Sequence, residues 1–124
     1  MKKAILVLII GILFYTGYQG IKKAQVIPKS DLAEVNLDQK MLIEDILKEA
    51  KSEINDKMDN DEDLSLGPCL LNPSAIDEDW VVDMSHDPLN EDDKNTENQC
   101  SLYVKGVAKH FIEVDNKGNL LRFN

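Results

Sequence analysis

This sequence lacks most of the motifs that carry chemistry. It has no glycine-rich phosphate loop, no serine nucleophile motif and no Cys-x-x-Cys pair. These absences remove the motif evidence for nucleotide binding, for serine-based hydrolysis and for dithiol redox catalysis. Only two histidines and two cysteines are present, and no internal repeat is visible. We therefore expect no cofactor, and the function has to be inferred from charge, hydropathy and residue spacing.

Positive charge is scarce in the middle of the chain. Residues 31–100 carry 21 acids and five lysines, whereas residues 1–30 have a net charge of +5 and residues 101–124 a net charge of +2. An acidic surface repels phosphate, which excludes nucleic acid as a partner. The same repulsion argues against a domain that lies flat on anionic lipid. The acidity is typical of a solvated, soluble surface.

One long hydrophobic run is present, at residues 4–21, where 18 consecutive residues without charge follow Lys2 and Lys3. A helix of that length spans about 27 Å, close to the hydrocarbon thickness of a bilayer. The run predicts a signal anchor or signal peptide at residues 1–21, with the membrane as its partner. The following residues offer no good pair of small residues for cleavage. This favours a single-pass anchor in the cell membrane; a secreted or periplasmic protein after cleavage is the alternative.

The orientation is inferred from charge and from cysteine content. Lysines stand on both sides of the run, so the positive-inside count is nearly balanced. Acidic residues oppose translocation only weakly, and two cysteines are typical of one disulfide in an oxidising compartment. We expect Cys69 and Cys100 to pair. The predicted organisation is a linker at residues 22–35 and a small domain at residues 36–124 that faces outside the cytoplasm.

An amphipathic helix is predicted immediately after the linker. Asn36 can cap it, and Gln39 can reach back as in a capping box. Apolar residues then recur every fourth position, which defines a stripe along one side of a helix of about 22 residues. The stripe consists of Leu42, Ile46, Ala50, Ile54 and Met58, widened by Ile43 and Leu47. We expect this stripe to pack on the domain's own sheet; docking of a partner helix is the alternative.

The second half of the domain predicts strands. Cys69–Leu71 is a short candidate, and the β-forming residues of Trp80–His86 make the best one. Val107–Val114 and Leu120–Phe123 read as a hairpin, because residues 115–119 between them are strong turn formers. The predicted fold class is α+β: after the N-terminal transmembrane or signal helix, one amphipathic helix packs on a small antiparallel sheet of three to four strands.

Four residues are weak candidates for a metal or acid–base site: His86, His110, Asp83 and Asp87. Two histidines with a carboxylate can bind a metal, and a histidine–aspartate pair can move protons. However, Asp83 and His86 are three residues apart, so on a flat strand they point to opposite faces. This spacing favours histidines that are exposed or held by ordinary hydrogen bonds.

Three functions remain compatible with these features. The leading hypothesis is a membrane-anchored or secreted noncatalytic module that binds an unidentified protein or ligand outside the cytoplasm. The alternative is a structural subunit of a pilus-like or secretion filament, because such subunits also place an apolar N-terminal helix before a small disulfide-bearing sheet domain. The chain lacks an evident pilin processing site. A metal-dependent hydrolase that uses the histidines is the third hypothesis.

Overall fold

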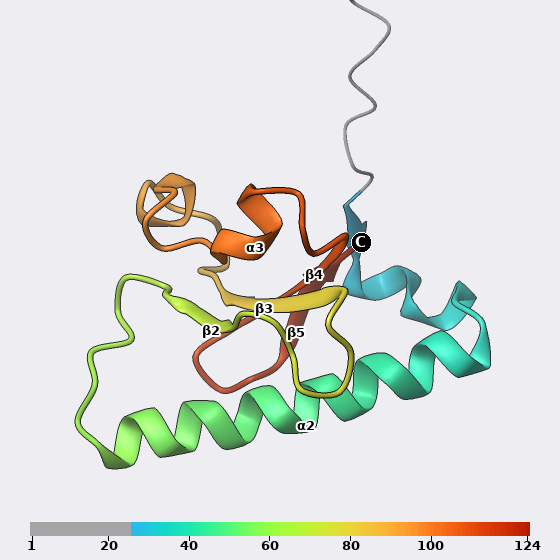
Figure 1. Ribbon diagram of the computed structural model, residues 1–124, viewed down its shortest axis with the longest axis horizontal. Helices are drawn as coiled ribbons and strands as arrows, with labels where there is room; N and C mark the ends of the chain where they lie inside the picture. The colour runs from blue at the N-terminus through green and yellow to red at the C-terminus, as the bar shows by residue number, and fades with distance from the viewer. Residues whose placement is uncertain (1–25) are drawn as a thin grey trace, which may run out of the picture.

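The computed structural model describes residues 26–124, so the predicted signal anchor and the start of the linker lie outside the described residues. Within the described part, no helix is long and apolar enough to cross a bilayer. The chain there is α+β, with one long helix and a five-stranded mixed sheet (Figure 1). In chain order the elements are β1 (Ile27–Pro28), η1 (Lys29–Glu34), α2 (Leu37–Asp59), β2 (Cys69–Leu71), β3 (Trp80–Met84), η2 (Asp92–Lys94), α3 (Ser101–Val104), β4 (His110–Val114) and β5 (Leu120–Phe123).

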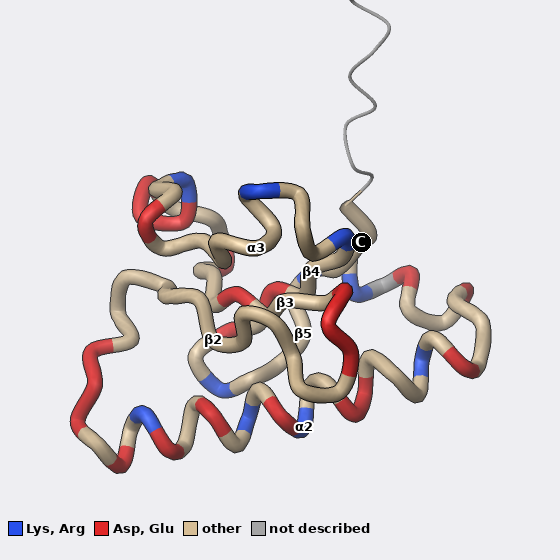
Figure 2. The backbone as a smooth tube through the Cα atoms, viewed as in Figure 1, with Lys and Arg blue, Asp and Glu red and all other residues tan. Residues whose placement is uncertain are grey.

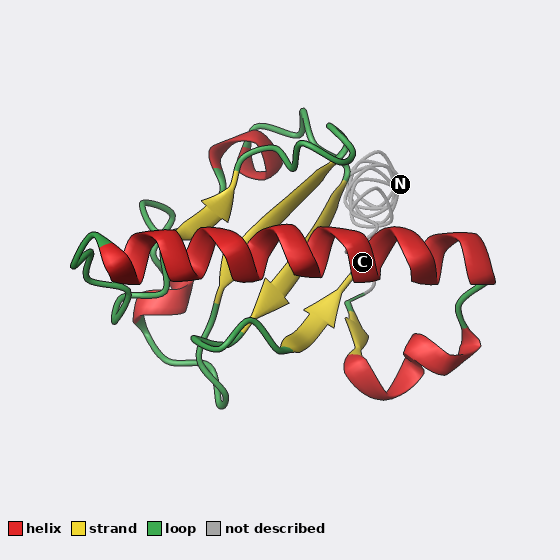
Figure 3. Ribbon diagram, turned by 90° about the horizontal axis from the view of Figure 1, so that it is seen from below, coloured by secondary structure: helices red, strands yellow, loops and turns green. Residues whose placement is uncertain are grey.

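Helix α2 lies where the sequence predicts it. The side-chain oxygen of Asn36 accepts a hydrogen bond from the backbone N–H of Gln39 at 2.9 Å, which satisfies one of the free amides of the first turn. The helix then crosses one face of the sheet (Figure 3). Its buried residues are Ile43, Ile46, Ala50 and Ile54. The predicted stripe therefore packs on the chain's own sheet, except for Met58, which is 58% exposed.

The sheet has the strand order β1-β5-β4-β3-β2. The β4–β5 hairpin is confirmed, and β2 pairs antiparallel with β3. Strands β3 and β4, however, run parallel, with Trp80 opposite His110 and Met84 opposite Val114. The predicted antiparallel sheet of three to four strands is therefore wrong. Parallel neighbours need a long crossover connection, and residues 85–109 supply it on the face opposite α2 (Figure 1).

The fifth strand comes from residues that the sequence assigns to the linker. Ile27 pairs with Phe123, and Pro28 pairs with Arg122. Proline is tolerated here because β1 is an edge strand, where a missing N–H donor leaves no partner unsatisfied. The result is a two-residue strand that covers the edge of β5.

Each face of the sheet has its own buried cluster. The larger cluster lies between α2 and the sheet, and its fully buried members on the strands are Val82, Ile112, Val114 and Phe123. The smaller cluster lies under α3 on the other face and consists of Val81, Cys100 and Ala108, with Cys69, Leu102, Tyr103 and Phe111 packed around it. We call these two sides the helix face and the disulfide face.

Cys69 and Cys100 form a disulfide, with their Cα atoms 4.9 Å apart, as the sequence predicts. The bond joins β2 to the residue that precedes α3. The two cysteines are 31 positions apart, so on the chain-entropy model the cross-link stabilises the fold by about 3–4 kcal/mol.

Acidic residues are spread along α2 and the loops (Figure 2). Some are paired with lysines on the surface: Lys48 binds Asp45 at 2.7 Å, and Lys57 lies between Glu53 at 3.4 Å and Glu62 at 2.9 Å. Exposed pairs of this kind contribute little to stability.

Candidate functional site

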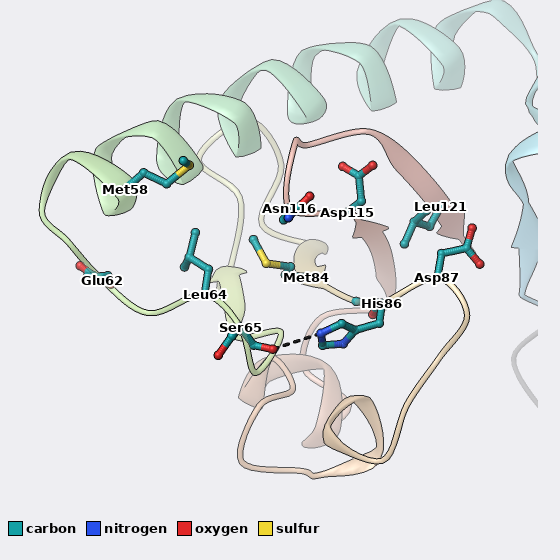
Figure 4. Close-up of a pocket in the computed structure, with 11 residues that line it drawn as sticks. Met58, Glu62, Leu64, Ser65, Met84, His86, Asp87, Asp115, Asn116 and Leu121 are labelled. Atoms are coloured by element: carbon teal, nitrogen blue, oxygen red, sulfur yellow. Dashed lines mark hydrogen bonds between the residues drawn. The ribbon is translucent and has the colours of Figure 1, made fainter.

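An open recess of about 640 Å³, which we call the terminal recess, lies where α2 ends and where the parallel strands β3 and β4 end (Figure 4). Ligands commonly bind beyond the carboxyl ends of parallel strands, because the loops that follow the strands meet at one edge of the sheet. The lining comes from α2 and its following turn, from the end of β3 and from the β4–β5 hairpin: Met58, Glu62, Leu64, Ser65, Met84, Ser85, His86, Asp87, Asp115, Asn116 and Leu121.

The lining of the terminal recess combines apolar and acidic side chains. Met58 belongs to the stripe of α2 that the sequence assigns to the core, yet it faces the recess and is 58% exposed. Leu64 and Met84 add apolar surface, and Glu62 and Asp87 add negative charge. A lining of this kind suits a ligand that presents an apolar group beside a positive charge.

His86 lies at the side of the terminal recess and is held by both of its ring nitrogens. Nδ1 lies 2.9 Å from Oδ1 of Asp93, and Nε2 lies 3.1 Å from the backbone oxygen of Ser65 (Figure 4). Both partners are hydrogen-bond acceptors, so the doubly protonated imidazolium satisfies both. The hydrogen bond to Asp93 raises the pKa of His86 above its ordinary value. His86 therefore has neither nitrogen available as a metal ligand or general base.

Asp93 anchors this arrangement from the loop that contains η2. Its side chain is only 2% exposed. Burial alone would raise the pKa of Asp93, but hydrogen bonds from the backbone N–H of Asn90 and from His86 outweigh burial and lower it. Asp93 also accepts the backbone N–H of His86 at 3.1 Å. The sequence drew attention to Asp83 and Asp87 beside His86, whereas the carboxylate that binds it stands seven residues along the chain.

His110 lies at the opposite end of the sheet. It begins β4, stacks on Trp80 with ring centroids 4.7 Å apart, and places Nδ1 3.1 Å from the backbone oxygen of Asn124. His110 pairs with Trp80 at the start of β3, whereas His86 follows the end of that strand at Met84. The strand alone spans about 13 Å between Trp80 and Met84. The two histidines are therefore too far apart to share a metal ion.

The four candidate residues are thus dispersed. Asp87 lines the terminal recess with His86, whereas Asp83 lies on the disulfide face and His110 at the far end of β4. In residues 26–124, no group of three or more histidine, cysteine or acidic side chains is placed to hold a metal ion. The geometry gives no support to the metal-dependent hydrolase.

A second, smaller recess of about 90 Å³ lies on the disulfide face. We call it the disulfide recess. It is lined by Val81, Asp83, Gln99, Cys100, Tyr103, Phe111 and Glu113. Burial and the neighbouring carboxylate of Glu113 raise the pKa of Asp83 to about 8, and the backbone N–H of Met84 opposes this shift only in part.

The sequence identifies Asp83 but not its neighbours. Glu113 alternates with the buried Ile112 and Val114, so its position on the other face is readable from a period of two. Its place directly beside Asp83 depends on the parallel register of β3 and β4. That register is fixed by the long crossover, for which the sequence carries no local signal.

Comparison of the chain with models of known protein families, with curated proteins and with solved structures gives no match.

Proposed function

We propose that this chain is a noncatalytic binding module held at a membrane, and that the terminal recess is where it contacts a protein partner. The single observation that carries the proposal is the lining of this recess. A volume of about 640 Å³ is bordered by apolar side chains from α2 and β3 and by carboxylates. The partner would insert an apolar side chain beside Met58 and Leu64 and place a lysine or arginine near Glu62 or Asp87.

A binding role also agrees with the state of His86. Its nitrogens bind Asp93 and Ser65. The ring therefore links two loops by hydrogen bonds and does not act as a base. Because both nitrogens of the His86 imidazole are occupied in this way, the terminal recess is better suited to binding a partner than to acid–base catalysis.

The chain offers a matched pair of positions for a direct test. Met58 and Met41 are both methionines on α2, 58% and 49% exposed, but of the two only Met58 lines the terminal recess. A photo-crosslinking amino acid at position 58, in the full chain in native membranes, should capture one protein that position 41 does not capture. Met58→Lys should then weaken binding of the captured protein about tenfold or more, whereas Met41→Lys should leave it unchanged. Equal capture from both positions would contradict the proposal.

The location is a separate part of the proposal, supported by the uncharged run at residues 4–21 and by the disulfide. The protein should fractionate with membranes, and protease added to spheroplasts should digest residues 36–124. A cytoplasmic protein in the same sample must remain intact. If protease digests the domain only after the membrane is permeabilised, the domain faces the cytoplasm and the proposed orientation is wrong.

A further inference from the structure

We propose that the disulfide recess binds a primary alkylammonium group, such as the end of a lysine side chain or of a free alkylamine. This site is separate from the terminal recess, and the proposal does not rest on the function proposed above. It follows from the charges, the unpaired atom and the size of the recess.

Three charged residues form a row across the disulfide face. In the strand register Asp83 lies beside Glu113, and Glu113 lies beside Arg122. Arg122 Nε donates to Oε2 of Glu113, and both side chains are about one-fifth exposed. The row holds two carboxyl groups and one guanidinium, so it lacks one positive charge when Asp83 is ionised.

Two buried atoms of the row have no hydrogen-bond partner among the described residues, Oδ1 of Asp83 and Nη2 of Arg122. Of the two, Oδ1 of Asp83 is the acceptor, which an ammonium donor would need. A buried polar atom without a partner is costly, and ligands commonly supply the partner that the protein omits. Asp83 lines the disulfide recess, so a donor bound there could supply the missing hydrogen bond.

The walls of the recess suit the stem of an amine. Tyr103 and Phe111 meet edge to face, with ring centroids 5.0 Å apart, and Asn124 Nδ2 donates to the hydroxyl of Tyr103 at 3.1 Å, which fixes that ring. Aromatic rings attract cations and accept methylene groups. The volume of about 90 Å³ equals about three water molecules, enough for an ammonium group and a short piece of its chain.

Other cations fit this recess less well. A divalent metal ion needs more oxygen ligands than two carboxyl groups provide, and no group of three ligating side chains occurs in the described part of the chain. A guanidinium is a broad planar fork that requires two acceptors in one plane. An ammonium is compact and donates three hydrogen bonds in different directions.

Binding should depend on pH, because an ammonium prefers the ionised carboxylate. The titrating and charged groups that face Asp83 are Glu113 from β4 with Arg122 behind it, Asp93 from the η2 loop and Tyr103 from α3. With the pKa of Asp83 at about 8, the competent fraction falls about tenfold for each pH unit below that value. Affinity should therefore rise from pH 6 to pH 8, and bound amine should lower the pKa of Asp83.

The test uses the full chain in nonionic detergent, with carbon-13 in the aspartate carboxyl groups and nitrogen-15 in the backbone. n-Butylammonium chloride, added to about 100 mM to cover millimolar affinities, should shift the Asp83 carboxyl signal saturably and lower its pKa. Tetramethylammonium chloride carries the same charge but donates no hydrogen bond. At equal ionic strength it should leave the Asp83 carboxyl signal and its pKa unchanged. Asp83→Asn should weaken binding about tenfold or more. Asp56→Asn, which changes an exposed acid on α2 that lines neither recess, should leave binding unchanged.

Two further ligands identify the source of the amine. A peptide with one lysine that binds more tightly than n-butylammonium supports a lysine side chain as the natural ligand, and the reverse order supports a free amine. Equal binding of the same peptide with norleucine in place of lysine would overturn the proposal. So would the absence of a saturable shift, which would mean that the recess holds water alone. Equal shifts with tetramethylammonium, or an equal loss of binding in Asp56→Asn, would also overturn it.

Discussion

The two faces of the sheet are stabilised by different means. On the helix face, α2 covers a continuous apolar cluster in which Ile46 and Ile112 are fully buried. On the disulfide face, only Val81, Cys100 and Ala108 are buried in the cluster, and the covering helix α3 has four residues. A covalent bond there provides stability that side-chain packing provides on the helix face. The disulfide face can therefore retain a recess and charged groups that a closely packed core would not tolerate.

Loss of the disulfide should have the largest effect, because the face that it stabilises has the smaller buried cluster. Replacing Cys69 and Cys100 together by serine should lower the free energy of unfolding by about 3–4 kcal/mol. Urea denaturation of the full chain in nonionic detergent measures the change. Reduction of the native protein with dithiothreitol controls for the new hydroxyl groups and should give a similar loss. A change below about 1 kcal/mol in both would mean that packing alone holds the disulfide face.

Truncating a core side chain on the helix face should cause the next largest loss of stability. Ile46→Ala removes a fully buried side chain of α2 and should cost about 2–4 kcal/mol through the cavity it leaves. Lys48 stands two residues away with its side chain 76% exposed, so Lys48→Ala should cost well under 1 kcal/mol. Thermal or urea unfolding compares the two. Small, equal effects would mean that α2 contributes little to the packed core.

The helix face is also the part of the molecule that the sequence predicts best, because its signals are local. The Asn36 cap and the apolar residue at every fourth position identify α2 from one continuous segment. The turn-forming residues around Gly118, whose φ is +74°, identify the final hairpin. Both predictions concern residues that are neighbours along the chain.

The disulfide face depends on contacts between distant segments, which local patterns do not encode. Residues 85–109 are mostly polar, but they carry the crossover that makes β3 and β4 parallel. Without that register, Asp83 cannot be placed beside Glu113. The pairing of His86 with Asp93 has the same origin, because the irregular loop between them has no period from which proximity could be inferred.

Neutralising Asp83 should stabilise the protein, in contrast to the two losses above. The folded pKa of Asp83 is about 8 against an ordinary value of 3.8, so between these values the folded state keeps a proton that the unfolded chain has lost. Stability therefore falls as pH rises from about 4 to about 8. Asp83→Asn removes this loss and should add about 1 kcal/mol or more at pH 9, a rise in Tm of about 4–8 °C, with little change at pH 4. Asp87→Asn is the control. A destabilised Asp83→Asn at pH 9 would show that the ionised carboxylate is favoured in the fold.

The smallest effect should be a local opening at the terminal recess when His86 loses its proton. The packing on the two faces of the sheet should not change with it. The raised pKa of His86 means that the stabilisation from its imidazolium is fully present below the ordinary value of 6.5 and is lost as pH rises through the folded value. Asp93 is buried and ionised, so the neutral ring should keep its proton on Nδ1, and the backbone oxygen of Ser65 then loses its donor. The turn that ends at Gly67, whose N–H donates to the Leu64 oxygen at 3.2 Å, should open more often.

Hydrogen exchange measures this opening. After correction for the intrinsic pH dependence of exchange, the protection of the Gly67 amide should decrease between pH 6 and pH 8. The protection of the strand amides that α2 covers should stay constant over the same range. In His86→Gln the protection should be lower and independent of pH, and in His110→Gln it should follow the native curve. Because Ser65 lines the terminal recess, the affinity of the captured partner should weaken over the same pH range. Protection that stays constant in the native protein would mean that His86 does not change its charge there, and that its hydrogen bonds to Asp93 and Ser65 are equally strong in the neutral ring.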